Sequence, residues 1–140
     1  MIKSVIAHLH FDGRGSEAIS FYEQALGAKV EARMHWSEMP GCQASAEEGR
    51  LIMHARLQVE QGGLLLADVP KNAPHRDRHN GTLMLEFDDA AELERCFDAL
   101  SQGGSVQMPV HDAFWGAKFA LVDDRFGVAW MLHCAHKTNG

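Results

Sequence analysis

The segments His8-Leu9-His10-Phe11-Asp12 and Met84-Leu85-Glu86-Phe87-Asp88 decide the fold, because the second repeats the first 76 residues further along the chain. The same offset, without a gap, aligns three further pairs of identical residues: Phe21 with Phe97, Gly27 with Gly103, and Val30 with Val106. Self-similarity at a fixed offset indicates the architecture more directly than a single motif does. Two long copies predict a duplicated module, since solenoids are built from many shorter repeats.

Length and composition are those of one globular domain. The chain has 140 residues, of which 46% are hydrophobic and 23% are charged. The net charge of −6 argues against nucleic acid as a partner, because such binding needs clustered Lys and Arg. No apolar run approaches the roughly 20 residues that a membrane-spanning helix requires.

The N-terminus and the cysteines predict a cytoplasmic protein. Residues 1–4 lead into an alternating strand and not into the apolar region of a signal peptide. The cysteines, Cys42, Cys96 and Cys134, are odd in number and have no C-x-x-C spacing. Such usage fits a reducing compartment better than a disulfide scaffold.

The first copy reads as strand, helix and three strands. Residues 4–11 alternate apolar and polar side chains, which is typical of a strand. Ser16 is predicted to cap a helix that Gly27 ends, and its apolar stripe holds Ala18, Phe21, Tyr22 and Ala25. Strands are expected at 28–36, 51–60 and 64–69, with a loop at 37–50 and a hairpin turn at 61–63.

The second copy follows the same order after a polar connector at 70–81. A strand is expected at 82–87, and Asp89 with Glu92 has the spacing of a helix capping box. The helix stripe comprises Leu93, Cys96, Phe97 and Leu100. Three further strands are expected at 105–109, 117–123 and 128–133.

These elements predict an α+β fold in which two tandem βαβββ modules form a curved mixed sheet that contains a cleft. We expect one domain over residues 1–140, with modules at about 3–69 and 82–134. Each amphipathic helix covers one face of its sheet. The other face must therefore meet the second sheet or a ligand.

Strand parity identifies the residues that look away from the helices. They are Ile6, His8 and His10 in the first strand, His54, Arg56 and Gln58 in the third, and Thr82, Met84 and Glu86 in the second copy. Asp68 at a strand end and Trp115 in a Gly-flanked loop are further candidates, the latter for a pocket wall or a dimer contact. Convergent titratable groups on a concave face predict a binding site. The alternative is a sheet with one face exposed to solvent and no binding site on it.

Several motifs resemble the PhnB-like branch of the vicinal oxygen chelate superfamily, which contains glyoxalases, bleomycin-resistance proteins and extradiol dioxygenases. They are Phe11-Asp12-Gly13, Glu17-Ala18, Phe21-Tyr22, Met53-His54-Ala55, Asp112-x-Phe114-Trp115-Gly116 and Asp124-x-Phe126-Gly127-x-x-Trp130-Met131-Leu132. The resemblance spans nearly the whole chain and implies the paired βαβββ fold. It also implies a homodimer, in which a partner covers open sheet edges.

Members of this superfamily that use a metal place four ligands on the first and last strands of the two modules. Those positions fall here at Ile6, Leu66, Thr82 and Met131. None is a usual ligand for a divalent ion, which prefers His, Asp or Glu. We therefore expect no metal at the family positions. A displaced site of His8, His10, His54 and Glu86 remains as the alternative.

Two functions follow from this resemblance. The first is a protein that binds a small polar or aromatic molecule in the cleft without bound metal, through His8, His10, His54, Glu86 and Trp115. The alternative is a metal-dependent lyase, isomerase or dioxygenase that uses the displaced histidine set, or an enzyme with acid–base work by Glu86 and a histidine.

Overall fold

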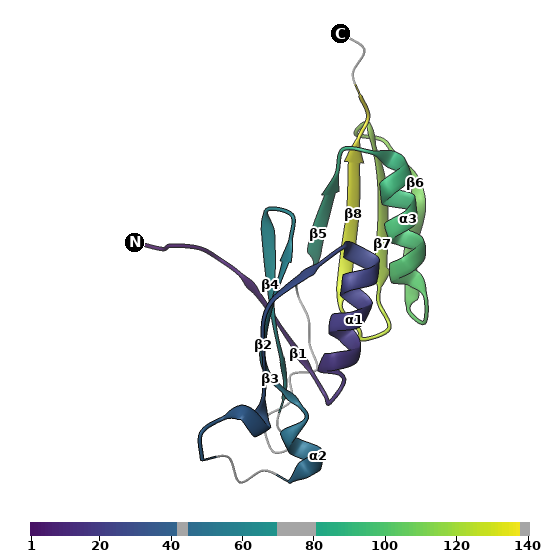
Figure 1. Ribbon diagram of the computed structural model, residues 1–140. Helices are drawn as coiled ribbons and strands as arrows, with labels where there is room; N and C mark the ends of the chain where they lie inside the picture. Colours follow the sequence, from purple (N-terminus) through teal and green to yellow (C-terminus); the bar gives the residue numbers. More distant parts are fainter. Residues whose placement is uncertain (42–44, 70–80, 138–140) are drawn as a thin grey trace. The chain divides into compact units, whose positions relative to one another are not determined.

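The computed structural model describes residues 1–41, 45–69 and 81–137 (Figure 1). The chain forms two compact units, Met1–His75 and Arg76–Gly140, and each unit holds one copy of the repeat. The predicted connector at 70–81 lies, apart from Gly81, outside the described residues, as does Cys42.

The first unit contains a four-stranded sheet in the order β1-β4-β3-β2. Its main elements are β1 (Ala7–Phe11), α1 (Gly15–Leu26), β2 (Lys29–His35), β3 (Ile52–Val59) and β4 (Gly62–Asp68). Strands β1 and β4 are parallel, and the other neighbours are antiparallel. Between β2 and β3, two short helices, η1 (Trp36–Glu38) and α2 (Ala46–Gly49), lie where a loop was expected.

The second unit repeats this topology with the order β5-β8-β7-β6. Its elements are β5 (Leu83–Phe87), α3 (Ala90–Ser101), β6 (Ser105–Ala113), β7 (Ala117–Asp123) and β8 (Ala129–Ala135). Again the first and last strands of the unit are parallel neighbours, and the remaining pairs are antiparallel. The predicted α+β fold of two βαβββ modules is confirmed.

Each helix buries one stripe of side chains against its own sheet. Helix α1 contacts β2, β3 and β4, and α3 contacts all four strands of the second unit. The buried stripes contain Ala18, Ile19, Tyr22 and Ala25 in α1, and Leu93, Cys96 and Leu100 in α3. Burial of one such Leu side chain contributes about 1.5–3 kcal/mol. These stripes confirm the helical periodicity predicted from the sequence, although Phe21 and Phe97 are only partly buried and Ile19 was not predicted.

Asp68 is buried in the first unit, where it joins two elements through their backbones. Its Oδ1 accepts a hydrogen bond from the Gly15 N–H and its Oδ2 accepts one from the Ile52 N–H, both at 2.8 Å. A Cβ atom at Gly15 would lie 2.8 Å from Asp68 Oδ2, so the first residue of α1 has to be glycine. Only 3% of Asp68 is exposed. Its predicted place in the ligand pocket is therefore corrected to a structural one.

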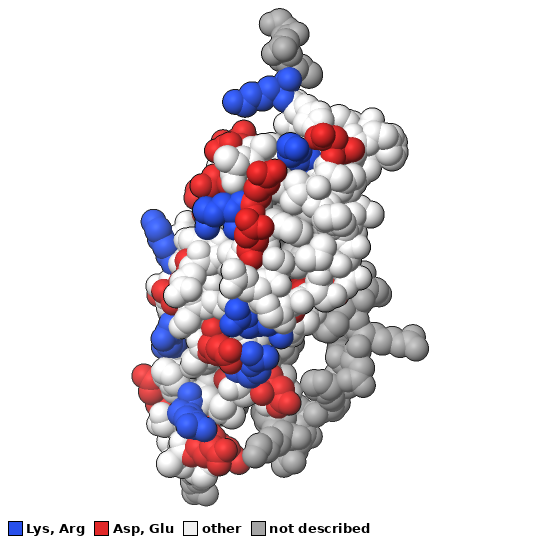
Figure 2. Space-filling model, turned by 90° about the vertical axis from the view of Figure 1, so that its right-hand side faces the viewer, with Lys and Arg blue, Asp and Glu red and all other residues white. Residues whose placement is uncertain are grey.

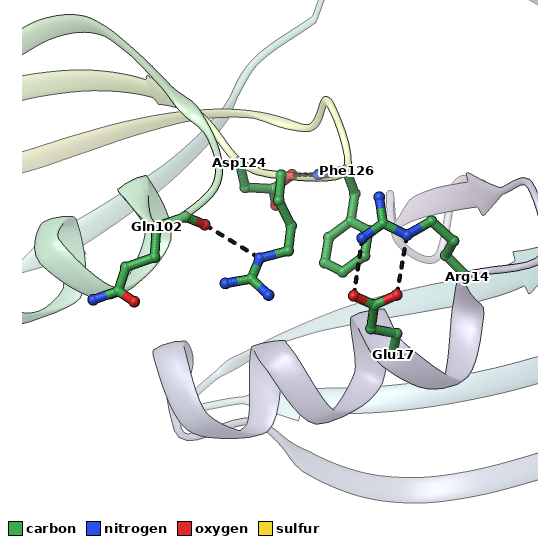
Figure 3. Close-up of polar contacts among 6 residues, drawn as sticks. Arg14, Glu17, Gln102, Asp124 and Phe126 are labelled. Atoms are coloured by element: carbon green, nitrogen blue, oxygen red, sulfur yellow. Dashed lines mark hydrogen bonds and ion pairs between the residues drawn. The ribbon is translucent and has the colours of Figure 1, made fainter.

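Asp124 is likewise a buried carboxylate that accepts several hydrogen bonds, here at the turn between β7 and β8. Its Oδ1 accepts hydrogen bonds from the Phe126 and Val128 N–H groups, and its Oδ2 accepts one from Trp130 Nε1 at 2.9 Å. Figure 3 shows the contact with Phe126 and, at the start of α1, the paired side chains of Arg14 and Glu17. The Asp-x-Phe-Gly-x-x-Trp spacing thus describes a carboxylate that ties a turn to the core.

Three local predictions were wrong. Helix α1 begins at Gly15 after Arg14, so Ser16 is inside the helix and not its cap. The hairpin turn lies at Glu60-Gln61, because Gly62 already pairs with Val59. Strand β6 continues beyond residue 109 to Ala113. It is an edge strand, and an edge strand tolerates the missing N–H of Pro109.

Candidate functional site

In the first unit, the face of the sheet that carries the predicted histidines is exposed. His8 in β1 and Arg56 in β3 both pair with Leu65 of β4, so the three side chains share one row. His10 and His54 lie two residues along the same strands and point the same way. The predicted parity of these strands is confirmed.

The histidines of this face influence one another. The rings of His8 and His10 stack with centroids 4.5 Å apart and an angle of 30° between planes. Partial burial is the main cause that lowers the pKa of His8, and the nearby charges of His10 and His54 lower this pKa further. The cluster therefore favours a neutral His8, which can both donate and accept a hydrogen bond.

Arg56 is engaged by the neighbouring strand. Its Nε lies 3.1 Å from Glu31 Oε2, and about half of each side chain is exposed. An exposed ion pair of this kind is worth little to stability. It does offset the charge of Arg56, which makes Arg56 a weaker anchor for an anionic ligand than the sequence alone suggested.

The residues at the family's metal positions do not fit a divalent ion. Leu66 is fully buried and pairs with Leu9 and Ala55 on the helix-covered face. Since Met84 pairs with Met131 and His8 pairs with Leu65, the equivalent of Met131 in the first unit is Leu65, which also lacks a donor. Within the described residues, no group of three or more His, Cys, Asp or Glu side chains is arranged to hold a metal ion.

In the second unit, Glu86 lies in a row of four side chains that crosses the open face. The parallel register of β5 and β8 places Glu86 beside His133. His133 pairs with Phe119 of β7, which in turn pairs with His111 of β6. Glu86 takes the place in the second copy that His10 has in the first. It thus has a histidine of its own unit, His133, as its neighbour.

His133 lies between a donor and a carboxylate. The Trp115 indole N–H donates to His133 Nε2 at 3.2 Å. His133 Nδ1 is buried, has no hydrogen-bond partner among the described residues, and lies 3.4 Å from Glu86 Oε2. Because an indole nitrogen only donates, Nε2 must carry a lone pair. The neutral tautomer of His133 therefore has its proton on Nδ1, which lies near Glu86 but makes no hydrogen bond with it.

Aromatic side chains surround this histidine. The ring of Trp115 packs edge-on against Phe119 and Phe114, each with centroids 5.1 Å away, and His111 packs against Phe119 at 6.0 Å. Phe114 is 98% exposed and Trp115 is 50% exposed.

The row beside the aromatic one is apolar. It consists of Met84, Met131, Leu121 and Met108, one from each strand. This face of the unit is an apolar aromatic floor that also carries the imidazoles of His133 and His111 and the carboxylate of Glu86.

The sequence predicted Glu86 and Trp115 but missed His133, Phe119 and His111. A signal for His133 was present, because it follows Met131 by two residues just as Glu86 follows Met84. Residues two apart in a strand share a face, so the pair could have been found. Its partnership with Trp115 could not, since that depends on how the turn between β6 and β7 folds back.

A second polar feature of this unit is an open hollow of about 310 Å³ near the start of α3. It is lined by Asp88, Asp89, Ala90, Lys118, Cys134, Ala135, His136 and Lys137. Beside it, hydrogen bonding by His136 and the charge of Lys118 lower the pKa of Asp112. On the face drawn in Figure 2, Lys and Arg alternate with Asp and Glu, so charges there are mixed.

The fold and these motifs define the class of protein. Residues 6–132 match the Glyoxalase/Bleomycin resistance protein/Dioxygenase superfamily, and the chain belongs to this superfamily. The family expected from the sequence is therefore confirmed.

Individual relatives agree with this assignment. Protein YjdN of Escherichia coli is 31% identical over 136 residues, which cover 90% of this chain and 91% of YjdN. Protein PA1353 from Pseudomonas aeruginosa is 39% identical, with a TM-score of 0.86 over 97% of this chain and all of that one. The PhnB protein from Bacillus cereus, 22% identical, has the same fold, with a TM-score of 0.80 over 95% of this chain and all of its own.

The described residues contain no helix that is long and apolar enough to cross a membrane.

Proposed function

We propose that this chain is a small-molecule-binding protein that holds a planar aromatic ligand on the open face of its second unit and needs no metal to do so. The observation that supports this function is the row Glu86–His133–Phe119 with Trp115 above it. It combines an apolar floor with a few polar groups, which is the usual composition of a ligand site.

The floor suits a flat ring. Phe119 offers an aromatic contact worth about 0.5–1.5 kcal/mol beyond the area buried, of the kind that it makes with Trp115 in this structure. Met84, Met108 and Met131 add polarizable thioethers that adapt to the outline of a ring. A saturated ligand of the same size would lose the aromatic part of this interaction.

Metal-free binding is supported by the chemistry of the side chains at the family positions. Ile6 and Met131 have no donor for a hard divalent ion, and Leu65 and Leu66 are aliphatic. The ligand would instead be oriented by His133, whose Nε2 accepts a hydrogen bond from Trp115 in this structure and whose Nδ1 lies 3.4 Å from Glu86.

The test is a titration of chelator-treated protein that carries ¹³C-methyl methionine. Phenol, indole and benzofuran should shift the methyl signals of Met84, Met108 and Met131 in a saturable way. Cyclohexanol should not, and the signals of Met34 and Met53 in the first unit serve as internal controls. The proposal fails if no aromatic probe saturates, or if saturation appears only after a divalent metal is added.

Variants locate the binding. Phe119→Leu keeps the volume apolar but removes the ring, so aromatic probes should bind about two- to tenfold more weakly. Trp36→Phe, an aromatic change in the first unit, is the matched control and should leave the affinity unchanged. Equal weakening by both variants would show that the open face of the second unit is not the site.

A second candidate function is an enzyme that uses Glu86 with a histidine for acid–base chemistry, whether as a lyase, an isomerase or a dioxygenase. The observation in its favour is the distance of 3.4 Å between His133 Nδ1 and Glu86 Oε2, because a nearby carboxylate can orient a general base. Turnover of thiol adducts or catechols that is lost in Glu86→Gln and in His133→Asn would establish it. Turnover lost only in His8→Ala and His54→Ala would move the centre to the first unit.

The proposal includes a cytoplasmic homodimer. In each unit the outermost antiparallel strand, β2 or β6, ends its sheet, and such an edge can pair with a second copy. Sedimentation equilibrium measures the mass directly, and a monomer at all concentrations would refute this part.

A further inference from the structure

We infer that Trp115 occupies the place of the ligand, and that the ligand is a neutral aromatic molecule with an N–H or O–H donor, such as a phenol, an indole or an N–H heterocycle. This inference rests on the proposed function and deepens it. The indole of Trp115 already makes the contacts that such a molecule would make. It packs edge-on against Phe119 and donates its N–H to His133 Nε2 at 3.2 Å.

The chemistry of His133 selects a donor. Its Nε2 carries a lone pair, since the group that it faces can only donate. A ketone, ether or carboxylate at this point would place one lone pair against another. The carboxylate of Glu86, 3.4 Å from Nδ1, favours a proton on Nδ1 through its charge, without a hydrogen bond, and also disfavours an anionic ligand. A neutral donor on a flat ring satisfies both conditions.

The Trp115 side chain lies where it can move away from His133 and Phe119. It lies in the turn between β6 and β7, beside Gly116, whose φ of +86° few other residues adopt. The turn is tied by its backbone, through the Gly116 N–H to the Ala113 carbonyl and the His136 N–H to the Gly116 carbonyl. The Trp115 side chain itself is half exposed. Its ring can therefore swing outward while the turn keeps its shape.

Displacement makes Trp115 a competitor of the ligand. A net hydrogen bond to a neutral acceptor changes affinity by about two- to tenfold, so removal of the indole N–H should strengthen the binding of a donor ligand by that factor. Trp115→Phe is the variant for this purpose, because it keeps an aromatic ring against Phe119 and Phe114 while it frees His133 Nε2. A ligand without a donor should gain by the same factor, because it too must break the Trp115–His133 hydrogen bond in the wild type.

Indole and benzofuran form the matched pair of probes, because they share a shape and only indole has an N–H. Wild-type protein should prefer indole about two- to tenfold, and Trp115→Phe should strengthen the binding of both probes while it leaves that preference unchanged. His133→Phe should reduce it to about one, with both probes still shifting the Met131 methyl signal if the variant is folded. Trp36→Phe serves as the control and should leave the preference as it is in the wild type.

The tautomer is measured separately, so a variant that fails to fold does not end the test. Long-range ¹H–¹⁵N correlation spectra of wild-type protein should show His133 with the proton on Nδ1 and a bare Nε2. A proton on Nε2 would overturn the inference. So would benzofuran binding as tightly as indole, in which case the proposed function stands and only the ligand class fails.

The remaining outcomes are also decisive. If neither probe binds, the proposed function itself fails. If Phe114→Ser dissociates a dimer and changes the Trp115 emission without any ligand, the occupant of this face is a second copy of the chain, and the inference is overturned.

Discussion

Replacement of Asp68 by Asn is expected to lower the free energy of unfolding by about 2.5–6 kcal/mol. The carboxylate accepts two backbone hydrogen bonds at 2.8 Å in a site that is 3% exposed. Asn keeps one acceptor, so one charge-assisted hydrogen bond worth about 1.5–3 kcal/mol is lost. Its NH₂ group then faces the N–H of Gly15 or Ile52, and that buried donor is left unsatisfied at a cost of about 1–3 kcal/mol.

Urea denaturation followed by far-UV circular dichroism gives the free energy by linear extrapolation. Asp12→Asn is the matched control, because Asp12 is exposed and lies in the same unit. Its effect should stay within about 0.5 kcal/mol, as for other surface substitutions. The slope of the transition should be the same in both variants if only the native state has changed.

A result within about 0.5 kcal/mol of wild type for Asp68→Asn would refute this reasoning. It would mean that the two backbone amides find other acceptors, and that Asp68 is free for the ligand role that the sequence suggested. A fall in stability that is equal for Asp12→Asn and Asp68→Asn would point to net charge, since both changes remove one negative charge.

The remaining predictions concern single groups. Gly15→Ala should destabilise the first unit in the same assay, because its Cβ would lie 2.8–3.0 Å from the Asp68 carboxylate. Burial raises the pKa of Cys96 to about 11, so at pH 8 only about 0.1% is thiolate, and a thiol reagent should modify Cys96 only after denaturant is added. The lowered pKa of His8 means that the unfolded chain binds the proton more tightly, so acidification below about pH 6.5 should cost stability. In an NMR titration, His54→Asn should raise the His8 midpoint, since it removes one of the three causes of the shift.

The repeat and the strand parity predicted most of the fold because both depend on local periodicity. The predicted helix stripes that contain Ala18 and Leu93 lie on buried faces, and His8 and His54 lie on an exposed face, as predicted. A period of 3.6 or 2 can be read from the side chains alone. Boundaries such as the start of α1 were less accurate, since Gly15 is fixed by a carboxylate 53 residues away.

The candidate site was predicted in part for the same reason. Glu86 was placed correctly by parity, but its neighbour His133 depends on which strands pair, and the sequence gives no direct measure of that. Asp68 was misplaced because a charged side chain is normally exposed. Its burial requires two unsatisfied backbone amides to meet at one point, which no periodicity records.

The two copies of the module have come to carry different chemistry on the same frame. His10 in β1 pairs with Ala67, whereas Glu86, its repeat-mate in β5, pairs with His133. In the first unit the fourth strand is apolar on the open face, with Leu65 and Ala67, and the histidines lie on the strands to either side. In the second unit the fourth strand itself carries the imidazole.

This difference explains why a loss of metal ligands need not mean a loss of function. A shared metal site requires donors from equivalent positions of both copies, and Leu65 and Met131 supply none. A site built within one copy requires only a neighbour in register, which Glu86 has in His133. Duplication permits that outcome, since one unit can keep the scaffold while the other acquires a polar group with its own support. The chemistry of this chain is therefore expected in the second unit, beside Trp115.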